Sequence, residues 1–278
     1  GLMEFQPSEP ARLAFSMALA SWLMFRENQQ TIKGLVPPFV ITFVPLLLIL
    51  REPDLGTSLL FLPILYAMLF AAGARTRHLI AAALIGITML PLLWQQMTSE
   101  QRSRIVMLFN QTDGGAVPAG DGFHLHQSKQ VLALGGIYGS IWNDEPIIDD
   151  SAAWQLPAAR EDFILSIIGE RYGLAGVSFV LLMYAVLVWR GIRAALKTHD
   201  PWGRLVAVGI VTMIGVQALI NSGMTVGLMP ITGMTLPFCS YGGSSLLSFS
   251  IAAGLLMNIT MRPGYDVAPL PFGQQRNQ

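Results

Sequence analysis

Seven long apolar stretches recur along the chain, and they constrain its fold more than any other feature. They run approximately over residues 9–25, 36–50, 55–73, 78–96, 161–189, 203–221 and 244–261. A helix needs about 20 mostly apolar residues to cross the roughly 30 Å hydrocarbon core of a bilayer. The composition agrees, since 53% of the residues are hydrophobic and only 12% are charged, against about 25% charged in a typical soluble domain. The sequence therefore predicts an all-α, polytopic membrane helix bundle.

The distribution of charge predicts the orientation of this bundle. Of the 17 Lys and Arg residues, 10 lie in segments 26–35, 74–77 and 190–204 and in the tail from 262. Only Glu27, Asp200 and Asp266 oppose them there. Because basic residues collect on the cytoplasmic side of a membrane, these segments are predicted to be cytoplasmic and Gly1 to lie outside. An odd number of spans is then expected before Gly1.

Charge and cysteine content exclude several functions. The chain has 17 basic and 17 acidic residues, so its net charge gives no reason to expect a nucleic-acid partner. Its single cysteine, Cys239, cannot form an internal disulfide, and no Cys/His spacing typical of a zinc site occurs. A metal ion, if one is bound, must therefore be held by oxygen atoms.

Two regions do not read as simple spans within the single transmembrane domain predicted over 1–262. Residues 97–160 form a long outer loop with an acidic run at 144–150, and short helices are expected at 101–110 and 124–134. Residues 221–245 are apolar but contain Pro230, Gly233 and Pro237, which are incompatible with one continuous helix. Because irregular backbone at membrane depth must be buried in protein or line a polar cavity, a re-entrant element facing a site is predicted. Residues 263–278 are expected to be a disordered cytoplasmic tail.

The stretch LPAAREDFILSIIGERYG, residues 156–173, places charges directly before an apolar segment. On a helix from Glu161 onward, Asp162, Ser166 and Glu170 would form one narrow polar line. Arg160 and Glu161 are interpreted as an interfacial collar. Asp162 either favours the positive N-terminus of a helix or has a function, since an ionisable residue at the edge of the hydrocarbon is costly to keep.

Other polar residues lie on the predicted outer side. In REPDLGTS, Asp54 is a plausible N-cap, whereas Glu52 is harder to explain by structure alone. In FQPSEPARL, Ser8 is interpreted as an N-cap and Glu9 as a first-turn residue. Several outer-side groups could bind a phosphate or pyrophosphate through charge, hydrogen bonds or a helix N-terminus. They are Arg102, Arg104, Gln127, Ser128, Lys129, Ser244 and Ser245, while His124 and His126 are assigned no role.

Several of these motifs together resemble one family. FQPSE, EPDLGT, LPxxxxDF, GMTVGLMPITGMTLPFCSYGGSSLL and the closing GLLMNI resemble the SEDS family of RodA/FtsW-type peptidoglycan polymerases over nearly the whole chain. The resemblance implies ten spans, of which the seven counted here would be the last. It also implies an inverting glycosyltransferase of the bacterial cytoplasmic membrane, which joins lipid II units at the outer face and serves elongation or division. A transpeptidase of the class B penicillin-binding type is the implied partner, beside the membrane lipids.

The resemblance also assigns a site. Asp162 matches the essential aspartate of the family, which would act as a general base or would hold a divalent cation such as Mg²⁺ or Mn²⁺. Arg104 and Lys129 are our candidates for neutralising the pyrophosphate, with Glu52 in the same cavity. The remaining candidates for substrate binding are Gln127, Ser128, Ser244 and Ser245.

The chain also departs from the family, and two other functions remain open. Where the family usually has Glu, His and Thr before its aspartate, this chain has Ala158, Arg160 and Glu161, and its glycine-rich stretch is shortened to Gly135, Gly136 and Gly139. One alternative is a flippase or transporter of lipid-linked precursors, which would place its acids near the membrane midplane. The other is a catalytically weak scaffold for a transpeptidase.

Overall fold

A computed structural model of the chain describes residues 6–26, 28–52, 54–111, 121–141, 160–262 and 264. Within these ranges the chain forms nine α-helices and one 3₁₀ turn, at Asn28–Gln30, and no strand. The acidic run at 144–150, Ala158 and the predicted tail from 265 onward lie outside the described residues.

Seven of the helices match the seven predicted apolar stretches. They are α1 (Ser8–Met24), α2 (Ile32–Leu50), α3 (Leu55–Ala71), α4 (Thr76–Gln96), α8 (Ile164–Lys197), α9 (Pro201–Thr225) and α10 (Gly243–Met261). Five of them, α2, α4, α8, α9 and α10, are long and apolar enough to cross a membrane. The all-α membrane bundle is therefore confirmed, with five candidate spans by this measure instead of seven. The described apolar part of α3, Gly56–Ala71, is shorter, and α1 has 17 residues with Glu9 and Arg12 near its start.

Side-chain caps set where several helices begin. The Asp54 carboxylate accepts a hydrogen bond of 3.0 Å from the backbone N–H of Thr57, which confirms Asp54 as the N-cap of α3. Asp200 caps α9 in the same way, at 2.7 Å from the Gly203 nitrogen. The N-cap of α1 is Pro7 and makes no side-chain bond, so the assignment of Ser8 as N-cap was wrong. A proline fits there because the first turn leaves its N–H groups without helical partners.

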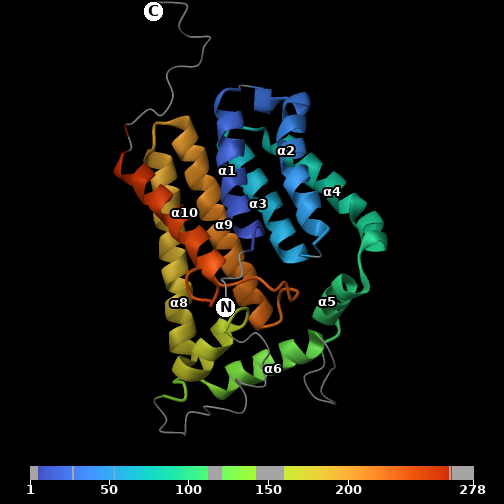
Figure 1. Cartoon of the computed structure of the whole chain (residues 1–278), viewed down its shortest axis with the longest axis vertical. Helices are drawn as coiled ribbons and strands as arrows, with labels where there is room; N and C mark the ends of the chain where they lie inside the picture. The colour runs from blue at the N-terminus through green and yellow to red at the C-terminus, as the bar shows by residue number, and fades with distance from the viewer. Residues whose placement is uncertain are drawn as a thin grey trace, which may run out of the picture.

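The two short helices predicted in the outer loop are confirmed as α5 (Ser99–Phe109) and α6 (Asp121–Leu134). Thr98 and Gln101 form a reciprocal capping box at the start of α5. Figure 1 shows α1, α3, α8 and α10 beginning at one end of the bundle, where α2 and α9 finish and which α6 crosses. We call this the α6 end. The other end is the basic end, because exposed Arg26, Arg75, Arg190 and Arg193 lie there.

Helix α9 is the centre of the bundle. It packs against α8, α3, α1 and α10, and most of its length is buried. Leu205, Val206, Ile210 and Ile214 belong to one apolar core together with side chains from α1 and α3. In contrast, α4 is almost wholly exposed and leans away from the bundle (Figure 1). Most side chains of α9 are therefore packed between helices and shielded from water.

Helix α8 differs from its prediction as one regular helix over 161–189. It starts at Ile164, because residues 160–162 form a turn, and it is broken at Gly173, where φ is +65° and ψ is −161°. The segment after α6 closes this break. The backbone nitrogens of Ser140 and Ile141 donate to the carbonyls of Glu170 and Arg171, at 2.9 and 3.2 Å, and the Leu174 nitrogen donates to Gly136 at 3.1 Å. Backbone groups that lose their helical partners at the break are thus hydrogen-bonded by residues 136–141, at least 30 positions earlier in the chain.

Replacing Gly173 should destabilise the protein. The dihedral angles of Gly173 lie in a region essentially restricted to glycine, where another residue costs roughly 1–3 kcal/mol. A Cβ at this position would also lie 2.4 Å from the carbonyl oxygen of Ile137. We expect Gly173→Ala to lower the unfolding temperature in detergent. The control is Gly254→Ala in α10, where a Cβ would meet nothing within 4 Å. Equal unfolding temperatures for the two variants would contradict the role of the break.

Candidate functional site

Asp162 lies at the α6 end of the bundle, in the turn that precedes α8. Its carboxylate is close to the irregular segment after α9, since a Cβ built on Gly233 would lie 3.7 Å from Oδ2. Its own carbonyl oxygen accepts a hydrogen bond of 2.8 Å from Asn221 Nδ2. Two residues earlier, the carbonyl of Arg160 accepts a hydrogen bond of 2.9 Å from the backbone nitrogen of Tyr241. The turn is therefore held from two sides.

The predicted polar line along α8 is not one helical face. Asp162 lies before the helix, whereas Ser166 and Glu170 are buried within it. The Ser166 hydroxyl shares a hydrogen bond of 2.7 Å with Ser128 of α6. The line is therefore interrupted, and only its first member reaches the surface turn.

The segment between α9 and α10, residues 226–242, is not helical, as its prolines and glycines predicted. We call it the Pro/Gly element. It enters the bundle, because the Tyr184 hydroxyl donates to the carbonyl of Pro237. Tyr184 lies 11 residues beyond the break at Gly173, a rise of about 16 Å along a helix. The element also packs on α3, where a Cβ on Gly56 would lie 2.6 Å from the carbonyl oxygen of Thr232.

Burial changes the acidity of Asp162. The pKa of its carboxyl is raised to about 6, first by burial and second by the negative charge of Glu161. Arg104 of α5 lowers this pKa and Asp54 raises it, so both lie close enough to act on the carboxylate. An apolar cluster of Phe163, Leu125, Met224 and Ile231 lies beside the turn, since Phe163 directly follows Asp162. Asp162 thus stays largely ionised at neutral pH and is poised to take up a proton.

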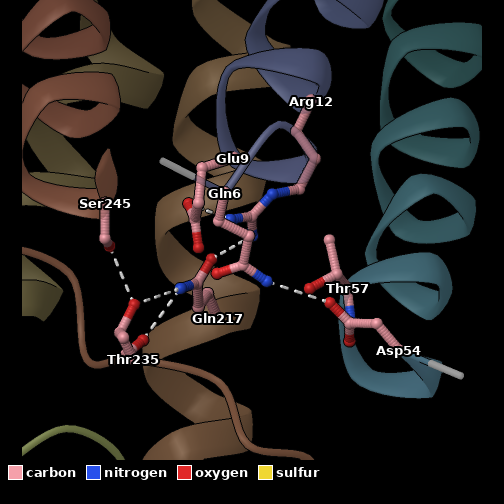
Figure 2. Close-up of polar contacts among 8 residues, drawn as sticks. All are labelled: Gln6, Glu9, Arg12, Asp54, Thr57, Gln217, Thr235 and Ser245. Atoms are coloured by element: carbon pink, nitrogen blue, oxygen red, sulfur yellow. Dashed lines mark hydrogen bonds and ion pairs between the residues drawn. The ribbon is translucent and has the colours of Figure 1, made fainter. Parts of the chain in front are cut away.

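A second polar centre lies between α1 and α9, and the sequence analysis missed it. Arg12 is 1% exposed, pairs with Glu9 one turn earlier and donates to the side-chain oxygen of Gln217 (Figure 2). The Gln217 amide in turn donates to the carbonyl oxygen of Thr235 at 2.8 Å. The hydroxyl of Thr235 shares a hydrogen bond of 2.8 Å with Ser245. One chain of contacts thus joins α1, α9, the Pro/Gly element and α10.

Asp54 connects this centre with Asp162. Besides capping α3, it accepts a hydrogen bond of 3.3 Å from Gln6 (Figure 2). It also interacts electrostatically with Arg12 and with Asp162. The interpretation of Glu9 as a simple first-turn residue was therefore incomplete. A detectable signal was present, because Glu9 and Arg12 at i and i+3 in an apolar helix need a polar partner from another helix.

The other predicted site residues lie in different surroundings. Arg104 is brought near Asp162, as the pKa effect shows. Ser245 is buried against Thr235, Ser244 is half-buried in the first turn of α10, and Glu52 is exposed in the turn after α2. The apolar stretch predicted from 244 begins as α10 at Gly243, so Ser244 and Ser245 lie in the first turn of a helix. Binding of an anion by these residues stays a prediction.

The α6 candidates lie along the contact between α6, α8 and α9. Ser128 is fully buried, and its hydroxyl donates to the carbonyl of Thr225 at 3.0 Å as well as pairing with Ser166. Lys129 donates to the side-chain oxygen of Gln111, whose amide donates to the carbonyl of Gly227 at 2.7 Å. Gln127 is buried beside them. Ser128 therefore holds helices together, and Lys129 lies at the C-terminal end of α9.

A divalent cation would find an incomplete set of ligands. Within the described ranges, no three His, Cys, Asp or Glu side chains gather in a way that could hold a metal ion. Asp162 could supply one carboxylate ligand, with the rest of the coordination left to the substrate or to water. Magnesium sites with one or two carboxylates and substrate phosphates are common.

The helices and the half-buried carboxylate at the α6 end define a multi-pass membrane protein with a polar site at one end of its bundle. Comparison with known proteins gives its family. The family of cell cycle proteins named for FtsW, RodA and SpoVE matches residues 1–264. The chain belongs to this SEDS family, so the resemblance in the sequence is confirmed.

Individual relatives agree with this assignment. The chain is 38% identical to stage V sporulation protein E of Bacillus subtilis strain 168, over 95% of this chain and 71% of that protein. It is 38% identical to the probable peptidoglycan glycosyltransferase FtsW of Geobacter metallireducens, over 92% of this chain and 67% of that one. For the peptidoglycan glycosyltransferase MrdB of Escherichia coli strain K12, the identity is 33% over 93% and 69%.

Solved structures show the same fold. A chain of a peptidoglycan synthase complex superimposes with a TM-score of 0.77 at 28% identity, covering 96% of this chain and 73% of that one. The rod shape determining protein RodA of Thermus thermophilus gives a TM-score of 0.63 at 27% identity, covering 96% and 69%.

Removing one partner of the buried Glu9–Arg12 ion pair should destabilise the protein more than replacing both partners. Arg12→Met leaves Glu9 buried without its cation, and the loss of one partner of such a pair costs about 3–5 kcal/mol. The double variant Glu9→Met/Arg12→Met should recover part of this loss, because it removes the unpaired charge but still leaves the Gln217 side-chain oxygen without its donor. Unfolding in detergent measures both. A double variant as unstable as Arg12→Met would contradict the pairing.

Proposed function

We propose that this chain is a peptidoglycan glycosyltransferase, which polymerises lipid II into glycan strands at the outer face of the bacterial cytoplasmic membrane. One observation carries the proposal. A carboxylate with a raised pKa, Asp162, is held beside the Pro/Gly element at the end of the bundle, in a chain that belongs to a family with named peptidoglycan glycosyltransferases. Cell elongation and division are the processes it would serve.

The arrangement in the membrane follows from the two ends of the bundle. We infer that α1 and α3 cross the membrane with the five longer helices, which gives the seven predicted spans. The exposed arginines of the basic end support a cytoplasmic position for that end, and hence an outer position for Asp162. The Pro/Gly element is then re-entrant, and its contact with Tyr184 pairs a backbone carbonyl at depth.

In the proposed reaction Asp162 is the general base. Its carboxylate accepts the proton of the attacking sugar hydroxyl. The oxygen of that hydroxyl forms a bond to the anomeric carbon of the donor sugar. The bond from that carbon to the pyrophosphate oxygen breaks, so the configuration at this carbon inverts and undecaprenyl pyrophosphate leaves with the electron pair. Asp162 passes its proton to water. A pKa of about 6 suits this step, because a base works best when its pKa is near the working pH.

The leaving pyrophosphate needs positive charge or hydrogen-bond donors. Arg104 is the best placed cation, since its charge already acts on Asp162. The substrate surface is proposed to include Lys129, Glu52 and Ser244. The other three candidates, Gln127, Ser128 and Ser245, are buried, so their proposed role is to support this surface from behind. In a second form of the proposal Asp162 would be one ligand of a Mg²⁺ or Mn²⁺ ion, which would supply positive charge for the pyrophosphate.

A transporter of lipid-linked precursors is less well supported. A carrier needs ionisable residues near the midplane that become accessible from either side. Here Asp162 lies outside α8, and Glu9 and Arg12 are in the first two turns of α1 at the same end. The other alternative, a catalytically weak scaffold, would have the same fold. Only a measurement of polymerising activity distinguishes it from the proposed enzyme.

A transpeptidase of the class B penicillin-binding type is the proposed partner. The similar chain of the solved peptidoglycan synthase complex, a structure that concerns polymerization and crosslinking together, supports this pairing. Lipid II and the membrane lipids are the other partners.

Replacing the base tests the function directly. With purified whole protein and lipid II, Asp162→Asn should lower polymer yield at least about 100-fold, the usual contribution of a general base. The control is Glu161→Gln, the neighbouring exposed carboxylate, which should stay active at pH 8. A chelator in the same assay separates the two roles of Asp162, since only the ion-ligand role predicts loss that Mg²⁺ restores. Full activity of Asp162→Asn would refute the proposal.

The pH dependence should move in opposite directions in two variants. In the wild type, kcat/KM should fall as the pH drops through about 6, because protonation removes the base. Removing positive charge in Arg104→Gln disfavours the carboxylate and should raise the pH at which activity falls. Removing negative charge in Glu161→Gln should lower that pH. Rates measured from pH 5 to 8 give the midpoints, and midpoints that do not move, or move together, would contradict the electrostatics of the site.

A further inference from the structure

Helix α9 carries a stripe of polar side chains inside an apolar helix. Gln217, Asn221 and Thr225 recur at i, i+4 and i+8 and are all fully buried. A buried amide without hydrogen bonds costs free energy, so each member should have a partner that fixes its orientation. Gln217 has Arg12 and Thr235 as partners. Among the described residues, the Thr225 hydroxyl bonds only carbonyls of its own helix, those of Asn221 and Ser222. Asn221, in contrast, bonds two segments outside α9.

The Asn221 amide bridges two segments that are not part of α9. Its Nδ2 donates to the carbonyl of Asp162 at 2.8 Å and to the carbonyl of Met234 at 2.6 Å. Both of its N–H groups are therefore used, one on the turn before α8 and one on the Pro/Gly element. Its Oδ1 is buried and has no hydrogen-bond partner among the described residues. Flipping the amide would place Oδ1 against two carbonyl oxygens, so the two donated bonds fix its orientation.

The turn needs this support because Asp162 is outside the regular helix. A residue within α8 would have its direction set by the helical ladder, whereas residues 160–162 are fixed by contacts from elsewhere. The contacts are the Asn221 amide and the bond from Tyr241 to the carbonyl of Arg160. Met234 and the Gly233 that faces the carboxylate are consecutive in the Pro/Gly element. The same amide thus anchors the base and the backbone opposite it.

We propose that Asn221 is a positioning residue, which holds the Asp162 turn and the Pro/Gly element in one fixed relation so that the carboxylate faces the acceptor hydroxyl. It does not touch the substrate. The inference rests on the proposed function, because it names what aligns the base of that reaction. Misplacement of a catalytic group by about 1 Å can cost 100-fold in rate, so the loss of this amide should be visible in kcat.

The test compares two substitutions on the same stripe of α9, in the whole protein with lipid II as substrate. Asn221→Ala removes both bridging bonds, and we expect kcat to fall at least tenfold with KM changed less than twofold. Thr225→Val, equally buried and nearly isosteric, breaks only bonds within α9 and should keep the wild-type kcat.

A second readout separates positioning from simple loss of folded protein. Once released, the Asp162 carboxyl gains water, so the acid limb of the pH profile should shift below its wild-type position in Asn221→Ala and stay in place in Thr225→Val. Glu161, Arg104 and Asp54 are the charged groups that also act on this limb, and neither variant changes them. If Asn221→Ala cannot be recovered folded, Asn221→Ser, which keeps one donor, is judged by the same limb.

The outcomes decide separately on the two proposals. A loss of rate that matches the loss of folded protein, with an unmoved acid limb, overturns the positioning role. So does wild-type kcat in Asn221→Ala when Asp162→Asn is inactive, and in that case the proposed function stands. If Asp162→Asn is itself active, the proposed function fails whatever Asn221 does.

Discussion

The burial of two amide side chains in the middle of an apolar helix is the constraint on which the rest of this site depends. Gln217 and Asn221 lie on the fully buried stripe of α9, where water cannot satisfy them. Each must therefore find its hydrogen-bond partners in neighbouring segments. Gln217 takes Arg12 and Thr235, and Asn221 takes the carbonyls of Asp162 and Met234. The central helix thus fixes the segments on which the proposed chemistry depends.

The irregular parts of the molecule become possible through the same pairing. The Pro/Gly element has no helix of its own to satisfy its backbone, and Asn221, Gln217 and Tyr184 bond three of its carbonyls. The turn before α8 is likewise held by Asn221 and Tyr241. This arrangement places the half-buried Asp162 carboxylate next to the non-helical Pro/Gly element, while hydrogen bonds hold the backbone of both. Pairing of this kind pre-organises a base before its substrate arrives.

Much of this fold follows from local sequence patterns, and the parts that do not follow depend on distant contacts. The apolar stretches, the Asp54 cap, α5, α6 and the non-helical Pro/Gly element each depend on residues close in sequence, and all were predicted. Asp162 was singled out for the same reason. The pairing of Arg12 with Gln217 joins residues 205 positions apart, so no local pattern reveals it. The break at Gly173 is equally hidden, because the groups that stabilise it come from residues 136–141.

The central claim is that Asp162 is a partly desolvated carboxyl in a turn held by the buried amide of Asn221. Infrared difference spectroscopy of the whole protein, with Asp162→Asn as the reference, measures the protonation of this one group. The account predicts a protonated carboxyl band that is absent from the variant. In the wild type this band should disappear as the pH rises, with a midpoint near pH 6. A midpoint near pH 4, the ordinary value of an exposed aspartate, would contradict it.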